Sequence, residues 1–163
     1  MSTLFLFLFA LLGLIFSAFF SGMEIAFISS SKLKIELDNK KGQFSAKILS
    51  FFSSKPAWFI AAMLIGNNIA LVIYTLYVAE LIEPYLTSLA LNSSIILLFQ
   101  TLFSTFFILL FAEFLPKSIF RLNPNYTLRI FSLILFVFYI ILWPITAFVV
   151  NLSNSILKLF GNE

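Results

Sequence analysis

Long apolar runs alternate with short polar segments along this chain of 163 residues. Three runs, at residues 4–28, 57–82 and 93–115, are long enough for a helix to cross a hydrocarbon core of about 30 Å, since a helix rises about 1.5 Å per residue. A fourth uncharged run, at residues 130–150, contains Pro144 and meets the same length criterion. The pattern predicts an all-α integral membrane protein with three transmembrane helices or, alternatively, four.

Residues 31–54 follow a different pattern, because lysines alternate there with leucine, isoleucine and phenylalanine. This segment predicts two short amphipathic helices on the membrane surface, with a break between Asn39 and Gly42. A solvated loop is the alternative, and the apolar content of the segment disfavours it.

Prolines mark the boundaries of the predicted spans. Pro56 suits the first turn of the second span, where a helix needs no amide hydrogen. Glu83 and Pro84 predict the start of an external connection that ends near Asn92. Pro116 lies close to the end of the third span.

Composition supports a single membrane domain that covers residues 1–163. The chain is 61% hydrophobic and 10% charged, whereas soluble proteins are typically about 45–50% apolar and about 25% charged. The sequence contains no Cys and no His, so thiol catalysis, the usual neutral-pH general base and the commonest zinc ligands are absent. We therefore do not expect an enzyme.

The distribution of positive charge predicts the orientation of the chain. Six lysines lie within residues 32–55, no Lys or Arg occurs from 56 to 116, and three cations follow within residues 117–129. The positive-inside rule places both basic segments in the cytoplasm and the N-terminus outside. Orientation and contact with anionic lipid explain these charges, so nucleic-acid binding is not expected. The start of the chain lacks a basic region, so we expect no cleaved signal peptide.

Polar groups inside the apolar runs are the candidate functional residues. Ser21 and Glu24 lie on one face of the first predicted span, and Asn67 and Asn68 lie near the middle of the second. Glu113 lies in the third span. A charged residue at membrane depth costs about 2.5–3.5 kcal/mol on insertion scales, so such a residue usually faces a polar interior. Hydroxyl, amide and carboxylate oxygens from three spans predict a site for a hard cation such as magnesium, manganese or calcium.

Pro116 strengthens this interpretation. In a regular α-helix its missing amide hydrogen would have bonded the carbonyl of Ala112, which stands next to Glu113. A freed carbonyl beside a carboxylate supplies two oxygen ligands. At membrane depth, freed backbone groups persist only where protein or a water-lined cavity satisfies them.

Each of these residues also has a structural interpretation. Ser21 is a common kind of helix-packing residue, and Asn67 with Asn68 would form hydrogen bonds between helices. Glu24 would pair with a lysine at the cytoplasmic edge. Glu113 would form an ion pair with Lys117, four residues later.

Three segments of the sequence resemble the signature segments of a known family. They are FFSGMEIA at residues 19–26, IGNNI at 65–69 and AEFLPK at 112–117. These resemble the DUF21 transmembrane domain of the CorC and cyclin-M (CNNM) family of magnesium transporters. The resemblance extends over residues 4–155.

The resemblance implies a magnesium exporter of the cytoplasmic membrane that is coupled to sodium entry. It implies a homodimer, with three membrane helices per protomer and juxtamembrane helices that surround the domain as a belt. Residues 126–157 would then form a belt helix, which would place the C-terminus in the cytoplasm. Family members carry cytoplasmic CBS domains that bind adenine nucleotides, and we expect the chain to hold the membrane domain without them.

The resemblance also implies the ligands of a transported magnesium ion. Side chains would come from Ser21, Asn67, Asn68 and Glu113. Main-chain carbonyls would come from Gly66 and Ala112, and Glu24 matches an acidic position near the ion path or the sodium path. An ion-sensing membrane scaffold that transports nothing is the alternative function, because the outer halves of the spans are nearly all apolar.

Overall fold

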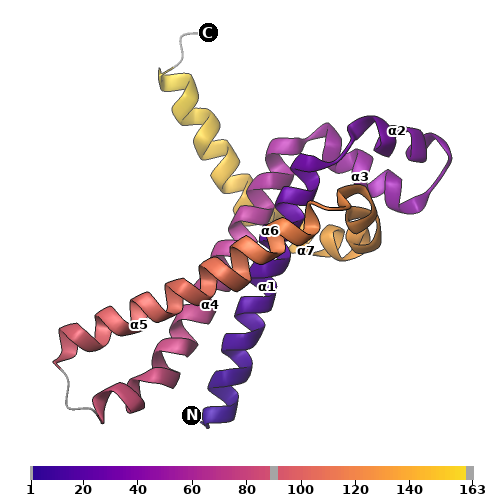
Figure 1. Ribbon diagram of the computed structural model, residues 1–163. Helices are drawn as coiled ribbons and strands as arrows, with labels where there is room; N and C mark the ends of the chain where they lie inside the picture. The colour runs from indigo at the N-terminus through magenta and orange to yellow at the C-terminus, as the bar shows by residue number, and fades with distance from the viewer. Residues whose placement is uncertain (1, 89–91, 161–163) are drawn as a thin grey trace. The chain divides into compact units, whose positions relative to one another are not determined.

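The computed structural model describes residues 2–88 and 92–160, and every regular element in this part of the chain is a helix (Figure 1). The helices in chain order are α1 (Thr3–Ser29), α2 (Lys32–Lys40), α3 (Phe44–Ser54), α4 (Pro56–Thr87), α5 (Ser93–Phe107), the π-helix η1 (Ile108–Phe114), α6 (Leu115–Phe120) and α7 (Pro124–Phe160). The all-helical fold predicted from the sequence is confirmed.

Within the described residues, four helical stretches are long and apolar enough to cross a membrane: Thr3–Ser29, Pro56–Thr87, Ser93–Phe120 and Pro124–Lys158. Most of their large apolar side chains are exposed. Such exposure suits lipid rather than water, since large apolar patches are rare on soluble monomers. The chain is therefore a multi-pass membrane protein, and a fold with four spans is consistent with these helices.

The chain divides into two compact units, each assembled from separate stretches of sequence. The first unit contains the described residues of Met1–Gly22 and Asn67–Ile119. The second contains those of Met23–Gly66 and Phe120–Glu163. The first unit thus holds the start of α1, the end of α4, the whole of α5 and η1, and α6 as far as Ile119.

In the first unit α1 and α4 approach each other through their backbones. A Cβ atom added to Gly13 would lie 2.8 Å from the amide nitrogen of Tyr74 and 3.0 Å from the carbonyl oxygen of Ala70. Only glycine fits at this crossing, as is common where membrane helices meet. Towards the start of α1, the rings of Phe5 and Phe9 pack against Tyr77, with centroids 6.1 Å and 5.1 Å from it.

The end of α4 differs from the sequence prediction. The helix does not stop at Glu83 but continues through Pro84 to Thr87. The Thr87 hydroxyl donates to the carbonyl oxygens of Glu83 and Pro84, at 3.0 Å and 3.1 Å. The prediction was wrong because an exposed helix end tolerates a proline, since water can satisfy the carbonyl that loses its donor.

The third predicted span also extends further than the sequence suggested, since α5, η1 and α6 form continuous helix to Phe120. The central seven residues have π rather than α geometry. Asn92 caps the start, with its side-chain oxygen accepting from the Ser94 amide at 3.4 Å. No feature of the apolar pattern predicted the π segment.

The second unit contains the α2–α3 hairpin and the whole of α7. Gly42 allows the reversal between α2 and α3 because its φ is 78°. Ser31 caps α2 by accepting from the Lys34 amide, and its own amide donates to Asn125 at 3.2 Å. Aromatic rings form the core, with the Phe52 ring 4.7 Å from Phe59.

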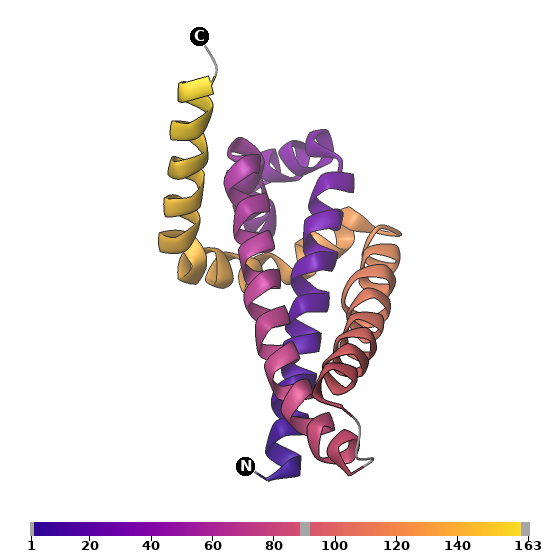
Figure 2. The ribbon, with the colours of Figure 1, turned by 90° about the vertical axis from the view of Figure 1, so that its left-hand side faces the viewer.

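One face of α7 packs within the second unit. Its buried residues recur at intervals of three and four: Leu128, Ser132, Leu135, Tyr139, Leu142 and Thr146. From residue 148 to 158 nearly every position is exposed. Figure 2 shows the orange first part of α7 turning sharply into its yellow last part. Pro144 lies inside this helix, where its ring clashes with the preceding turn and bends the chain. Whether α7 is a belt helix or a fourth span stays a prediction.

Candidate cation site

Three small residues follow one another at four-residue intervals along α1 and so share a face: Gly13, Ser17 and Ser21. Gly13 brings the α4 backbone close, as described above. The two serines are completely buried in a helix that is otherwise strongly apolar. The stripe therefore places hydroxyl groups on the face of α1 that packs within the first unit.

Ser17 forms a direct contact with a predicted site residue. Its hydroxyl donates to the Asn67 side-chain oxygen at 2.6 Å, and both groups are buried. This hydrogen bond orients the amide and joins helices that are 50 residues apart in sequence. Sequence reasoning missed Ser17, although its position one turn before Ser21 was a usable signal.

The Ser21 side chain is fully buried, and its oxygen has no hydrogen-bond partner in the described part of the chain. Ser53, in α3, carries the other such hydroxyl. A buried hydroxyl without a partner costs about 1–3 kcal/mol. Serines in helices often avoid this cost by bonding a carbonyl in the preceding turn. Ser21 is thus free to bind a ligand.

Asn67 and Asn68 do not point in the same direction. Successive helical residues are about 100° apart, and Asn67 is buried while Asn68 is exposed. The two amides therefore differ as candidate ligands, since Asn67 faces Ser17 in the interior of the first unit.

The π-helix η1 contains Ala112 and Glu113. In this segment hydrogen bonds reach five residues back, and the amide of Leu115 donates to the carbonyl of Leu110. Pro116 follows at once and has no amide hydrogen. Continued in the π register, its missing bond would belong to the carbonyl of Phe111, and in the α register to that of Ala112. Segments of π-helix are frequent at functional sites because they shift side chains and loosen the carbonyl ladder.

Glu113 forms an ion pair with Lys117. The Lys117 nitrogen lies 3.6 Å from one carboxylate oxygen, and the two side chains are 42% and 34% exposed. Charge-assisted hydrogen bonds measure about 2.7–2.9 Å, so this pair is loose. The ion pair predicted as the structural role of Glu113 is therefore observed. Because the pair is loose, the carboxylate oxygens can still accept a cation.

Gly66 and Glu24 belong to the second unit. Gly66 is buried, and Glu24 is partly exposed near the end of α1. Ser21, Asn67, Asn68, Ala112 and Glu113 all belong to the first unit.

The donor set of the first unit suits a hard cation. It offers hydroxyl, amide, carboxylate and carbonyl oxygens, which are the ligands of magnesium and calcium. No group of three or more His, Cys, Asp or Glu side chains occurs in the described residues. Neutral oxygens would therefore provide most of the coordination, with one carboxylate.

Comparison with known proteins establishes the family. Residues 6–163 match the model of the cyclin M transmembrane N-terminal domain. The chain belongs to the cyclin M transmembrane family. The resemblance of the three sequence segments is thereby confirmed.

Relatives of this cyclin M domain occur in several bacteria. It is 30% identical over 128 residues to the UPF0053 protein MG146 of Mycoplasma genitalium, which covers 78% of this chain and 28% of that protein. It is 26% identical over 145 residues to the UPF0053 inner membrane protein YfjD of Escherichia coli, covering 89% and 32%. A UPF0053 protein of Haemophilus influenzae is 27% identical over 165 residues, covering 99% and 36%. The chain thus spans about a third of the length of these relatives. Family membership supports a role in membrane ion transport or a related one.

Proposed function

We propose that this cyclin M domain exports magnesium across the cytoplasmic membrane, with sodium entry as the driving process. The observation that carries the proposal is the buried Ser21 hydroxyl, which has no partner among the described residues and lies one turn from the Ser17–Asn67 hydrogen bond. Retaining an unpaired hydroxyl inside an apolar helix makes sense if an ion completes its coordination.

In this proposal the ion binds side-chain oxygens of Ser21, Asn67, Asn68 and Glu113. Magnesium favours six oxygens in a near-octahedral arrangement at about 2.0–2.1 Å. The loose pair with Lys117 fits an alternating role, in which the ammonium group neutralises Glu113 whenever the cation has left. The π geometry of η1 supports the use of main-chain oxygens beside Glu113, at Ala112 or one residue earlier.

Two ligands of the proposed site come from the family resemblance alone. Gly66 would contribute a carbonyl, and Glu24 would lie near the ion path or the sodium path. Both belong to the second unit. Their roles stay predictions.

The proposed location is the cytoplasmic membrane, and the Escherichia coli relative is named as an inner membrane protein. The basic segment that includes α2 and α3 would face the cytoplasm, with the N-terminus outside. If α7 is a belt helix, the C-terminus is cytoplasmic as well. We further propose a homodimer, and a longer protein in which CBS domains follow this domain.

An ion-sensing scaffold is the second candidate function. The observation in its favour is the apolar character of the first unit where the end of α4 meets the start of α1, because an ion needs a polar route. In this alternative, Ser21 and Glu113 bind magnesium but no flux follows.

Magnesium flux into or out of liposomes separates the two functions. The purified protein is reconstituted with a magnesium-sensitive dye inside the vesicles, and flux is followed with and without a sodium gradient. We expect flux from the parent and from Ser29→Ala, whose hydroxyl is exposed, and its loss in Ser21→Ala. Saturable binding without flux in the parent would support the scaffold. Equal flux in Ser21→Ala and Ser29→Ala would contradict the proposed site.

A further inference from the structure

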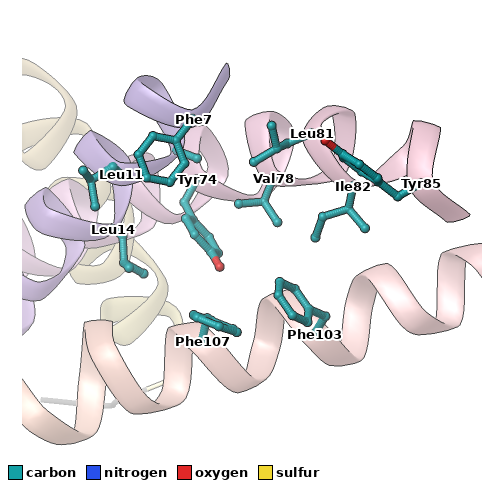
Figure 3. A pocket seen from close by; sticks show the side chains of 11 residues that line it. Phe7, Leu11, Leu14, Tyr74, Val78, Leu81, Ile82, Tyr85, Phe103 and Phe107 are labelled. Carbon is teal, nitrogen blue, oxygen red and sulfur yellow. The ribbon is translucent and has the colours of Figure 1, made fainter. Parts of the chain in front are cut away.

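The first unit contains an apolar cavity of about 430 Å³ between α1, α4 and α5 (Figure 3). Ala10 comes from α1, Tyr74 and Val78 come from α4, and Phe103 and Phe107 come from α5. The cavity is about three times the size of an apolar cavity of about 150 Å³ that binds benzene. It has room for several carbons of an aliphatic chain.

The walls of the cavity exclude ions and polar metabolites. Its lining contains no charged residue, and the only polar side-chain atoms belong to the phenols of Tyr74 and Tyr85. A desolvated ion would find no ligands there. The cavity is therefore separate in its chemistry from the cation site, whose donors are all oxygens.

Tyr74 directs a hydroxyl group into this apolar space. Its side chain is only 4% exposed, and Figure 3 shows the oxygen pointing into the cavity towards α5. Within the described ranges, the Tyr74 hydroxyl forms no hydrogen bond with another residue. The hydroxyl is open to the cavity, so an occupant that fills this space would bury it, and burying an unpaired hydroxyl is costly.

The cavity is continuous with the lipid-facing surface. Phe7, Leu11 and Phe103 line it and are also 51%, 41% and 48% exposed. Tyr74 lies six residues before Glu80, the first charged residue of α4, which is about 9 Å along the helix. A lipid that enters the cavity thus brings its ester group, just below the membrane interface, within reach of the phenol.

We propose that this cavity binds one acyl chain of a bilayer lipid and that the Tyr74 hydroxyl donates a hydrogen bond to an ester oxygen of the same lipid. Acyl carbons match the walls, and the ester supplies the acceptor that Tyr74 lacks. The bound chain fills the space between α4 and α5 and so links the lipid composition of the membrane to the packing of the first unit. This site does not depend on the proposed transport function.

Retained lipid can be counted by native mass spectrometry of the delipidated protein, titrated with dioleoyl phosphatidylcholine in detergent. We expect one tightly held lipid per chain in the parent. Val78→Phe fills the cavity and should lose that lipid. Val72→Phe makes the same change at a position on α4 that is 57% exposed and outside the cavity, and it should keep the lipid.

Three results would overturn the proposal. They are a parent that holds no lipid, a Val78→Phe protein that holds as much as Val72→Phe, and a change in oligomer mass confined to Val78→Phe, which would assign the cavity to a second copy. If Val78→Phe does not fold by circular dichroism, Ala10→Leu fills the same cavity from α1 and replaces it in the comparison.

Replacing Tyr74 tests the ester contact. Tyr74→Phe should weaken binding of the ester lipid by about two- to tenfold, which is the effect of one hydrogen bond. It should not change binding of an ether-linked analogue, which has no carbonyl. Tyr77→Phe, whose ring packs on Phe5 and Phe9, is the matched control and should bind both lipids as the parent does. An equal loss for both lipids in Tyr74→Phe would contradict the hydrogen bond.

Discussion

The two units of this domain join their helices by different means. In the first unit, α1 and α4 meet through Gly13 and the buried Ser17–Asn67 hydrogen bond. In the second unit, aromatic rings make the contacts, and the ring centroid of Phe59 lies 4.4 Å from that of Phe27 and 4.7 Å from that of Phe52.

The first unit therefore has a polar interior, whereas the interior of the second unit consists of packed aromatic rings with a structural role. Lipid tails are as apolar as a helix surface, so close backbone approach and hydrogen bonds hold membrane helices together. Such contacts also allow polar groups to be buried, which a site for a cation requires. The aromatic core gives stability without any ligand, so substitutions in the two units should affect different properties.

The largest effect on stability should come from Phe52→Ala in the second unit. Phe52 is almost fully buried, and its ring packs on Phe59 and Tyr139. Removing such a side chain costs about 3–5 kcal/mol, including the cavity left behind. Unfolding in detergent, followed by circular dichroism, measures the loss. Phe44→Ala is the control because Phe44 is 68% exposed; an equal loss in both variants would show that the aromatic core has no special role.

Gly13→Ala should have the next largest effect. The added Cβ would lie 2.8 Å from a backbone nitrogen of α4, so the helices must separate. Overpacking of this kind costs about 1–3 kcal/mol. The same unfolding experiment should show little change for Leu12→Ala, on the exposed side of the helix. A Gly13→Ala protein as stable as the parent would contradict the close approach of α1 and α4.

Ser17→Ala should destabilise the first unit by about 1–3 kcal/mol, because the Asn67 oxygen loses its buried partner. A double-mutant cycle with Asn67→Ala isolates the pair, and we expect a coupling energy of about 0.5–3 kcal/mol. Strictly additive effects would mean that the hydrogen bond contributes nothing to the contact between the helices.

Ser21→Ala should have the smallest effect on stability, and in particular a smaller one than Ser17→Ala. Its hydroxyl has no partner to lose among the described residues, so without magnesium the variant should be within about 1 kcal/mol of the parent or slightly more stable. Magnesium should raise the unfolding temperature of the parent but not that of Ser21→Ala. A cost as large as that of Ser17→Ala would show that the Ser21 hydroxyl has a structural partner instead.

The sequence predicted much of the fold because apolar runs of more than 20 residues leave few alternatives to membrane helices. Pro84 was misleading, since proline breaks helices inside a protein but is tolerated at an exposed end. The π geometry of η1 depends on which carbonyl each amide selects, and no residue pattern specifies that choice. The Ser17–Asn67 bond joins positions 50 residues apart, so a single sequence could not reveal it.

Part of the candidate site could also be predicted from the apolar runs. Polar residues within apolar runs are visible in the sequence, and they identified Ser21, Asn67 and Glu113 as candidates. The different exposures of Asn67 and Asn68 follow from the rotation of α4, which periodicity alone left undetermined. Gly13 was overlooked because one glycine among leucines carries little information without the helix that packs against it.

The most direct test of the cation site is magnesium binding measured by calorimetry on the purified protein in detergent. The parent and Glu80→Gln, which removes an exposed carboxylate at the far end of α4, should both show saturable binding. Glu113→Gln keeps the shape of the side chain but removes the charge, and it should abolish binding. Unchanged magnesium affinity in Glu113→Gln would contradict the proposed cation site and leave Glu113 only as the ion-pair partner of Lys117.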